Sequence, residues 1–203
     1  MGIAERKERE KAELKGRIMG AAKQLFLEKG IDNTSMRNIA NLIEYSPGTI
    51  YHYFKDKSEI FHALHAEGFT ELGKRMMVLN SVSDPMERLK AMGKIYIRFG
   101  IENPEMYDLM FIKEAPVEFL EDKKNWSEGE AVHDGLKFTL ADCMDAGHFE
   151  GHDLDALTFM VWSCVHGMVS LQIRQRCDVV EEAKRDNIVE HAYQSLILIM
   201  ETL

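Results

Sequence analysis

The amino-acid sequence predicts an all-α protein with about nine helices. Apolar residues recur three and four positions apart along most of the chain, which is the spacing of helices that bury one face. Clusters of β-branched residues, which strands favour, are scarce, and only four prolines interrupt 203 residues. Helix-capping residues stand between successive apolar stripes. These three observations together argue against a fold built on a sheet.

Three helices are expected before residue 56. The first carries an apolar face over residues 14–26 and ends at Gly30, because glycine readily adopts the left-handed conformation that closes a helix. The second begins after Thr34 or Ser35, since either hydroxyl is suited to cap its first turn. The third is only about two turns long and begins at Ser46-Pro47, a cap followed by proline at the first helical position.

Six further helices are expected in the remaining chain. Asp56 and Ser127 each precede a glutamate by three residues, as in a capping box, and Pro85 and Pro104 each follow a residue suited to end or cap a helix. Residues 113–126 are expected to form a loop because they combine a proline with dense charge. The expected helices cover about residues 57–79, 85–103, 104–112, 127–145, 153–176 and 180–201.

The net charge of -9 is divided unevenly along the chain. Residues 1–60 hold 11 Lys and Arg against 9 Asp and Glu, a net charge of +2, whereas the remainder carries a net charge of -11. A mildly positive module attached to an acidic body fits a nucleic-acid reader carried by a second domain. The sequence therefore predicts two domains, residues 1–56 and residues 57–203.

The chain is expected in the cytoplasm. Its three cysteines are too widely spaced for a disulfide framework, and its N-terminal segment MGIAERKEREKAELKGR is too charged for a secretory signal peptide. Residues 156–173 contain no Lys, Arg, Asp or Glu and approach the length of a membrane span. Polar residues interrupt this segment and charges flank it closely, so we expect a helix buried at a subunit interface and no membrane contact.

The second and third helices, joined by a tight turn, describe a helix-turn-helix. The alternative is a helical hairpin used only for packing, in which the outward residues of the third helix would be arbitrary. Here hydroxyl, imidazole and ammonium groups surround a helix anchored by Ile50 and Phe54. Hydroxyls and lysines suit phosphate oxygens, and Gly48 lets the backbone approach DNA closely. These features predict a DNA-binding module.

Residues 10–62 resemble the signature of the TetR (tetracycline-repressor-like) family of bacterial transcription regulators. The resemblance is carried by SPGTIYHYFKDK at residues 46–57, by TSMRNIA at residues 34–40 and by Phe26-x3-Gly30. It implies that the second helix braces the DNA backbone while the third enters the major groove. It also implies a regulator, by default a repressor, that binds a palindromic double-stranded operator as a homodimer and is released by a small-molecule effector, without a cofactor.

The resemblance assigns DNA contacts to named residues of this chain. Thr34 or Ser35, together with Arg37, is expected near phosphate. The residues expected to face the major groove are Tyr45, Pro47, Gly48, Thr49, Tyr51 and His52. Those expected to hold the DNA backbone are Tyr53, Lys55 and Lys57.

One residue departs from the family's pattern. The family usually places a glycine where Glu44 stands in the turn, since a positive φ is easiest for glycine. We expect either a turn of a different shape or a Glu44 strained by roughly 1 kcal/mol.

The body of the chain resembles the family in architecture, and residues 103–111 with Trp162-x3-His166-Gly167 resemble one subtype of its C-terminal domains. We expect the helices at 156–173 and 180–201 to form a four-helix contact between two copies. The predicted interface residues are Val161, Cys164, Met168, Ile188, Ala192, Leu196 and Ile199.

An effector pocket is expected beside the helix at 57–79, closed by the loop 113–126. The many large apolar side chains of the body favour a mostly apolar effector, and its acidic charge favours a neutral or cationic one. The predicted lining is Tyr96, Phe99, Tyr107, Met110, Phe111, Trp126, Phe138, Trp162 and His166.

Other patterns give weaker alternatives. His148 and His152 are spaced for a helical metal site, but Gly147 and Gly151 break the helix that would align them, so no metal is expected. No nucleophile motif and no phosphate-binding glycine loop supports catalysis, so no enzyme is expected. The competing hypothesis is a helical small-molecule-binding protein or enzyme whose helix-turn-helix is vestigial.

Overall fold

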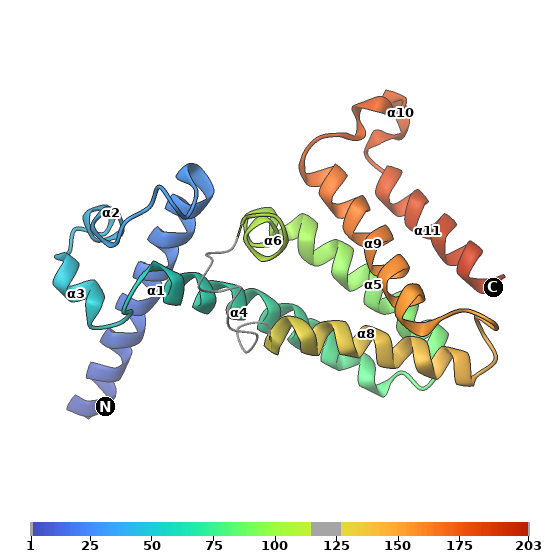
Figure 1. Ribbon diagram of the computed structural model, residues 1–203, viewed down its shortest axis with the longest axis horizontal. Helices are drawn as coiled ribbons and strands as arrows, with labels where there is room; N and C mark the ends of the chain where they lie inside the picture. The colour runs from blue at the N-terminus through green and yellow to red at the C-terminus, as the bar shows by residue number, and fades with distance from the viewer. Residues whose placement is uncertain (1, 115–126, 203) are drawn as a thin grey trace. The chain divides into compact units, whose positions relative to one another are not determined.

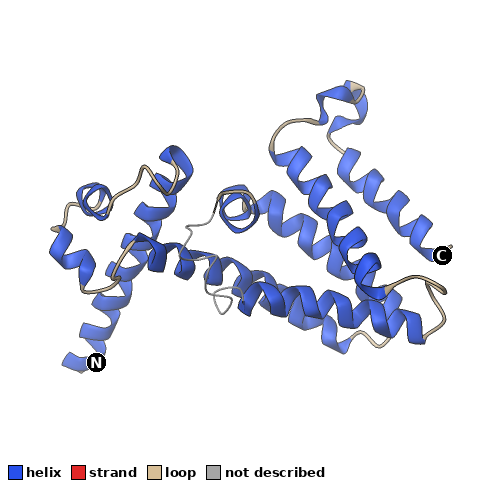
Figure 2. Ribbon diagram, in the orientation of Figure 1, coloured by secondary structure: helices blue, strands red, loops and turns tan. Residues whose placement is uncertain are grey.

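The computed structural model describes residues 2–114 and 127–202, and within these ranges every regular element is a helix (Figures 1 and 2). The predicted all-α class is confirmed. Ten α-helices and two short 3-10 helices occupy the described residues, where about nine helices were expected. The chain divides into two compact units, Met1–Phe69 with Glu105–Ser127 and Thr70–Pro104 with Glu128–Leu203.

The first unit is built on α1, a helix of 27 residues. Its other elements are two short helices, the first half of a long one, and a helix that begins at Pro104. Figure 1 shows α2 and α3 beside α1. The bounds are α1 Ile3–Lys29, α2 Met36–Leu42, α3 Pro47–Tyr51, α4 Lys57–Met77 and α6 Pro104–Phe111.

One apolar core joins all five of these helices. It extends past the helix-turn-helix, because Ile60, Phe61 and Leu64 of α4 and Leu109 of α6 belong to it. The fully buried side chains from the first three helices are Ile18, Ala22, Phe26, Ile39, Ala40 and Ile50. The burial of so many apolar groups is the main source of stability for this unit.

A row of aromatic rings extends from this core along α4 to α6. Phe26 contacts Phe61 with ring centroids 6.4 Å apart, and His65 lies between Phe61 and Phe69 at 5.9 and 4.8 Å. Phe69 then meets the edge of Phe111 at 5.2 Å. The row packs α6 against the first half of α4.

Polar contacts also attach α6 to α1. Lys23 forms an ion pair with Glu105 at 3.1 Å, and Lys113 donates from Nζ to the backbone oxygen of Leu27 at 3.2 Å. Gly68 allows the close approach of α4 and α6, because a Cβ there would lie 2.5 Å from the sulfur of Met110. The helix at 104–111 therefore belongs with the helix-turn-helix in packing.

The second unit is a bundle formed by the helices of Thr70–Pro104 and Glu128–Leu203. Helix α9 packs against both α5 and α11. Tyr193 of α11 donates to the backbone oxygen of Lys90 at 2.6 Å, in the space left by Gly93. The bounds are η1 Val78–Ser81, α5 Pro85–Glu102, α8 Ser127–Asp145, α9 Leu154–Ile173, η3 Cys177–Val179, α10 Glu182–Arg185 and α11 Ile188–Glu201.

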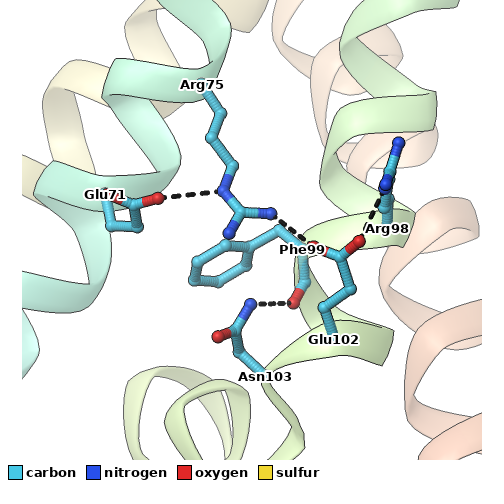
Figure 3. A network of polar contacts seen from close by, with 6 residues as sticks. All are labelled: Glu71, Arg75, Arg98, Phe99, Glu102 and Asn103. Carbon is cyan, nitrogen blue, oxygen red and sulfur yellow. Dashed lines mark hydrogen bonds and ion pairs between the residues drawn. The ribbon is translucent and has the colours of Figure 1, made fainter.

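A polar network ties the end of α4 to the end of α5 within this unit (Figure 3). Arg75 donates to Glu71 at 3.0 Å and to Glu102 at 2.7 Å, and its guanidinium lies 5.4 Å from the ring centroid of Phe99. Glu102 also accepts from Arg98 at 2.6 Å. These hydrogen bonds from Arg98 and Arg75 lower the pKa of Glu102, and those from Glu102 and Glu71 raise the pKa of Arg75. Both shifts favour the ionised forms of Glu102 and Arg75.

Several helix boundaries differ from the sequence-based expectation, and α9, for example, ends at Ile173 where residue 176 was expected. The expected last helix at 180–201 is wrong as a single element, because α10 ends at Arg185 and α11 begins at Ile188. Asp186 and Asn187 separate them, two residues whose side chains compete with the helix for backbone groups. The long helix expected to end near Leu79 stops as an α-helix at Met77 and continues as η1.

Helix α9 is the one described helix long and apolar enough to cross a membrane by length and composition. Its buried residues include Leu157, Val161 and Val169, while Phe159 and Met160 are exposed. Helix α9 packs against α5 and α11, and its exposed side chains Phe159, Met160 and Leu171 form an apolar surface that neither helix covers.

Candidate DNA interface

The start of α2 is fixed by a capping box. Ser35 Oγ accepts from the Asn38 amide at 3.1 Å, and Asn38 Oδ1 accepts from the Ser35 amide at 3.0 Å. Of the two expected capping residues, Ser35 is therefore the cap. Thr34 is 2% exposed, and its hydroxyl donates to the Gly30 backbone oxygen at 2.8 Å. Ser35 and Arg37 are exposed, whereas the buried hydroxyl of Thr34 closes the end of α1.

The turn between α2 and α3 contains a residue in the left-handed conformation, at the position where the family usually has a glycine. Glu44 has φ 61°, so the turn keeps the left-handed conformation that the expected strain requires. Its amide bonds to the Asn41 oxygen at 3.2 Å, and the amide of Tyr45 bonds to the Ala40 oxygen at 3.0 Å. This pair of hydrogen bonds is a Schellman motif, which requires the left-handed conformation at Glu44.

Helix α3 has a buried apolar inner side and polar groups on its outer side. Ser46 caps it by accepting from the Thr49 amide at 3.2 Å, and Pro47 follows at the first helical position. Ile50 is fully buried and holds the helix against the core. Tyr51 is 56% exposed, and Gly48 and His52 are exposed with it.

Arg17 braces the turn from α1, a role that no local sequence signal indicated. Its Nη2 donates to the Ile43 oxygen at 3.0 Å, and its guanidinium lies 5.2 Å from the ring centroid of Tyr45. Lys15 lies over the Phe54 ring at 5.5 Å in the same way. Both contacts join residues far apart in the sequence, so only the tertiary structure brings them together.

The two lysines after α3 occupy different environments. Lys55 is exposed, and its ammonium lies 3.9 Å from Asp56 Oδ2. The ammonium of Lys57 instead donates to the backbone oxygens of Ile31 at 2.8 Å and Asp32 at 3.2 Å. Lys57 therefore connects the start of α4 to the loop before α2, and two of its three ammonium hydrogens are used within the protein.

The residues expected to line one effector pocket fall in both compact units. Tyr107, Met110 and Phe111 lie in the first, and Tyr96, Phe99, Phe138, Trp162 and His166 in the second. Trp126 and most of the loop 113–126 lie outside the described residues. Phe138 is 63% exposed.

Three of these residues form a polar chain. Trp162 Nε1 donates to Tyr96 Oη at 3.3 Å, and Tyr96 Oη lies 3.1 Å from His166 Nδ1. Because the phenol oxygen accepts from Trp162, its own hydrogen is available for Nδ1. Burial lowers the pKa of His166, and the positive charge of Arg174 lowers it further. The ring at position 166 is therefore neutral at pH 7.

The residues expected at the dimer interface differ in exposure. Val161 is buried within the protomer, whereas Ile199 is exposed. The other five expected interface residues are all half-buried: Cys164, Met168, Ile188, Ala192 and Leu196. The most exposed apolar side chains on the two helices are Phe159, Met160, Leu171, Leu198 and Ile199.

No group of three or more His, Cys, Asp or Glu side chains within residues 2–114 and 127–202 could hold a metal ion. Cys143 is buried, and burial raises the pKa of its thiol to about 11. A thiol that stays protonated at neutral pH is a poor nucleophile and a poor metal ligand.

Two family models match the chain. Residues 18–64 match "Bacterial regulatory proteins, tetR family", and residues 89–196 match "Tetracyclin repressor-like, C-terminal domain". The first match covers the helix-turn-helix described above. The second covers more than half of the chain.

Individual proteins agree with these matches. The regulator SAB2452 of Staphylococcus aureus is 31% identical over 88 residues, which are 43% of this chain and 48% of that protein. The regulator ArpR of Pseudomonas putida is 23% identical over 82% of this chain and 83% of its own length. The structure of FadR from Bacillus subtilis in complex with stearoyl-CoA is similar with a TM-score of 0.69, at 19% identity over 87% of this chain and 96% of that one. The capped α2 and α3, the outward residues of α3 and the two matched models together place this chain in the TetR family of helix-turn-helix transcriptional regulators.

Proposed function

We propose that this regulator is a repressor that binds a palindromic operator as a dimer and is released by a small, mostly apolar effector. The observation that carries the DNA-binding part is the arrangement of α3, in which Ile50 is buried while Tyr51 and His52 are exposed. A vestigial module would have no need to keep these polar groups on the outer side of a capped helix.

In this proposal the exposed and half-buried residues around α3 divide by role. Tyr45, Pro47, Gly48, Thr49, Tyr51 and His52 face base edges in the major groove, and Ser35, Arg37, Tyr53 and Lys55 contact phosphate. Lys57 mainly positions the module, because its ammonium already binds two backbone oxygens.

The test is selection from a pool of duplexes with a randomised centre, using the full-length protein. Wild type should enrich a palindrome with half-sites roughly one or more helical turns apart. His52→Ala should change which bases are enriched, whereas Lys55→Ala should weaken all sequences about equally. Lys29→Ala, an exposed lysine near the end of α1, serves as the control. Failure of wild type to enrich any sequence would favour the vestigial alternative.

The proposed dimer uses the outer faces of α9 and α11. The exposed apolar residues Phe159, Leu171 and Leu198 support this assignment, since two such faces together give a four-helix contact. Val161 is buried within the protomer, so in this proposal it holds α9 in place and does not itself contact the partner. The same surface accounts for the length and apolarity of α9 without a membrane, and it agrees with a regulator that works in the cytoplasm.

The proposed effector site is centred on Tyr96, Trp162 and His166. Ligand sites combine apolar walls with a few converging polar groups, and this polar chain stands among apolar residues of α5 and α9. The net charge of -11 outside residues 1–60 favours a neutral or cationic compound over an anionic one.

The effector is tested with a panel of hydrophobic cations, neutral aromatics and acyl compounds, including stearoyl-CoA. Each compound is scored by thermal shift and by release of the selected duplex. A coupling of about 1–3 kcal/mol would reduce affinity for the duplex by about 5–150-fold. A compound that raises thermal stability without releasing DNA would contradict the proposed coupling, and the response should weaken in Tyr96→Phe.

A further inference from the structure

A groove of about 530 Å³ lies beside the helix-turn-helix, on the N-terminal part of α1. It is lined by Lys7, Glu10, Lys11, Glu13, Leu14, Arg17, Tyr45 and Tyr53. The two tyrosines come from either side of α3, and both belong to the residues proposed to contact DNA. The other six residues come from α1, in a segment that precedes the matched helix-turn-helix of residues 18–64.

Several charged side chains in this part of α1 already have partners within the protein. Arg6 pairs with Glu10 at 2.8 Å, and Arg9 pairs with Glu13 at 3.6 Å, so each of the two carboxylates of the groove already has a cationic partner. Arg17 is engaged with the turn through its contacts to Ile43 and Tyr45.

Lys7 and Lys11 are left as the two available cations of the groove. Both are exposed, and neither ammonium has an ion-pair or hydrogen-bond partner among residues 2–114 and 127–202. They are four residues apart on one helix, so their Cα atoms lie about 6 Å apart along the helix axis and on the same face. Leu14, one turn further on, packs against the core and fixes which face of α1 points to the helix-turn-helix.

We propose that Lys7 and Lys11 bind the sugar-phosphate backbone of the DNA that flanks the bases read by α3. The inference rests on the proposed function, because it requires α3 to lie in the major groove. In that position the adjoining backbone passes Tyr45 and Tyr53, and the groove continues from these tyrosines to the two lysines. The contact adds affinity for every sequence and no base preference, since phosphates carry no sequence information.

The test measures how the affinity for duplex DNA depends on salt, with wild type and the Lys7→Ala/Lys11→Ala variant. The probes are a fluorescein-labelled mixed-sequence duplex of roughly 40 base pairs and the duplex selected by wild type. The slope of log affinity against log salt should fall by about 2 per protomer, one for each lost phosphate contact. Affinity at about 0.15 M salt should fall at least tenfold for both duplexes, while their ratio stays the same.

Two control variants separate this contact from general effects. Lys74→Ala/Lys94→Ala removes the same charge from exposed positions of α4 and α5 and should leave the slope unchanged. Lys7→Arg/Lys11→Arg keeps the charge and should retain the wild-type slope, which excludes a loss caused by unwinding of the helix.

The outcomes distinguish this inference from the proposed function. A wild-type protein that binds neither duplex would overturn both. A wild type that binds, with an unchanged salt slope in Lys7→Ala/Lys11→Ala, would overturn only the backbone contact. A slope that falls equally in Lys74→Ala/Lys94→Ala would also overturn it, because net charge would then explain the effect.

Discussion

At the scale of single residues, Glu44 shows how one turn constrains the reading helix. The hydrogen bonds of Ala40 and Asn41 require a left-handed residue at position 44, and a glutamate there costs about 1–2 kcal/mol. The same geometry recurs at the end of α9, where Gln175 has φ 54°. Both residues keep a helix end at an energetic cost that glycine would avoid.

Glu44→Gly is therefore expected to raise the free energy of unfolding by up to about 1 kcal/mol, because relief of the strain exceeds the entropy cost of glycine. Gln175→Gly should change stability in the same direction. Glu44→Val should lower it by about 1 kcal/mol, since a β-branched side chain is the least tolerant of positive φ. Urea denaturation measures all three, and a destabilised Glu44→Gly would refute the strain.

His166 is expected to make stability depend on pH. Its pKa in the folded protein is lowered below the ordinary 6.5, so the unfolded chain takes up the proton first as pH falls. The neutral ring thus contributes stability above about pH 6.5 that is lost as pH falls toward the folded pKa. His166→Gln should cost about 0.5–1.5 kcal/mol at pH 7.5, through the hydrogen bond to Tyr96.

Thermal unfolding between pH 7.5 and pH 5 measures this effect. The difference between wild type and His166→Gln should shrink as the pH falls. His152→Gln, at an exposed position, is the control and should follow wild type. A constant difference across this range would contradict the assigned environment of His166.

At the scale of elements, α5 and α11 approach each other where Gly93 meets Tyr193. A Cβ at position 93 would lie 2.8 Å from two ring carbons of Tyr193, whose hydroxyl is held by the Lys90 oxygen. The ring cannot move without breaking that hydrogen bond. The close approach of the two helices therefore depends on glycine at this position.

Gly93→Ala is expected to destabilise the protein by about 1–3 kcal/mol through overpacking. Gly135→Ala is the matched control on α8, because a Cβ there meets nothing within 4 Å. That substitution should stabilise by about 0.5–1 kcal/mol, as alanine favours a helix. Calorimetry measures the stability of both variants. Equal changes in stability would show that the Tyr193 ring leaves room for a Cβ at position 93.

The elements that the sequence predicted well are those with local signals. Ser46 and Asp84 cap their helices as expected, and the Glu44 turn follows from the position of one residue. Contacts between distant segments left no such signal, as with Lys57 and the Ile31 oxygen. Hydrophobic periodicity also could not predict which side of α9 is buried. A helix that is apolar nearly all round does not indicate whether Val161 or Phe159 points inward.

At the scale of the whole molecule, the proposed dimer is the assembly that would carry two reading helices. Light scattering should give twice the chain mass of 23.3 kDa. Phe159 and Leu198 are each 64% exposed, so charging both should separate the protomers while each one still folds.

Phe159→Asp/Leu198→Asp is expected to give monomers that retain helical circular dichroism and lose affinity for the selected duplex by at least tenfold, since one reading head has half the contacts. Val78→Asp, at an exposed position of η1, should remain dimeric. A monomeric wild type would contradict the proposed interface.

The core shared by α1, α4 and α6 bears on how such regulators can be cut and recombined. A fragment that ends at residue 56 would lack Ile60, Phe61 and Leu64, and would leave the buried ring of Phe26 without its neighbour. A chimera joined after residue 69 would keep these three residues. It would still lack Leu109, so the foreign body would have to supply an apolar side chain at that point of the core. A foreign body therefore has to supply a helix equivalent to α6, so the reading head is exchangeable only together with a segment that lies beyond α5 in the sequence.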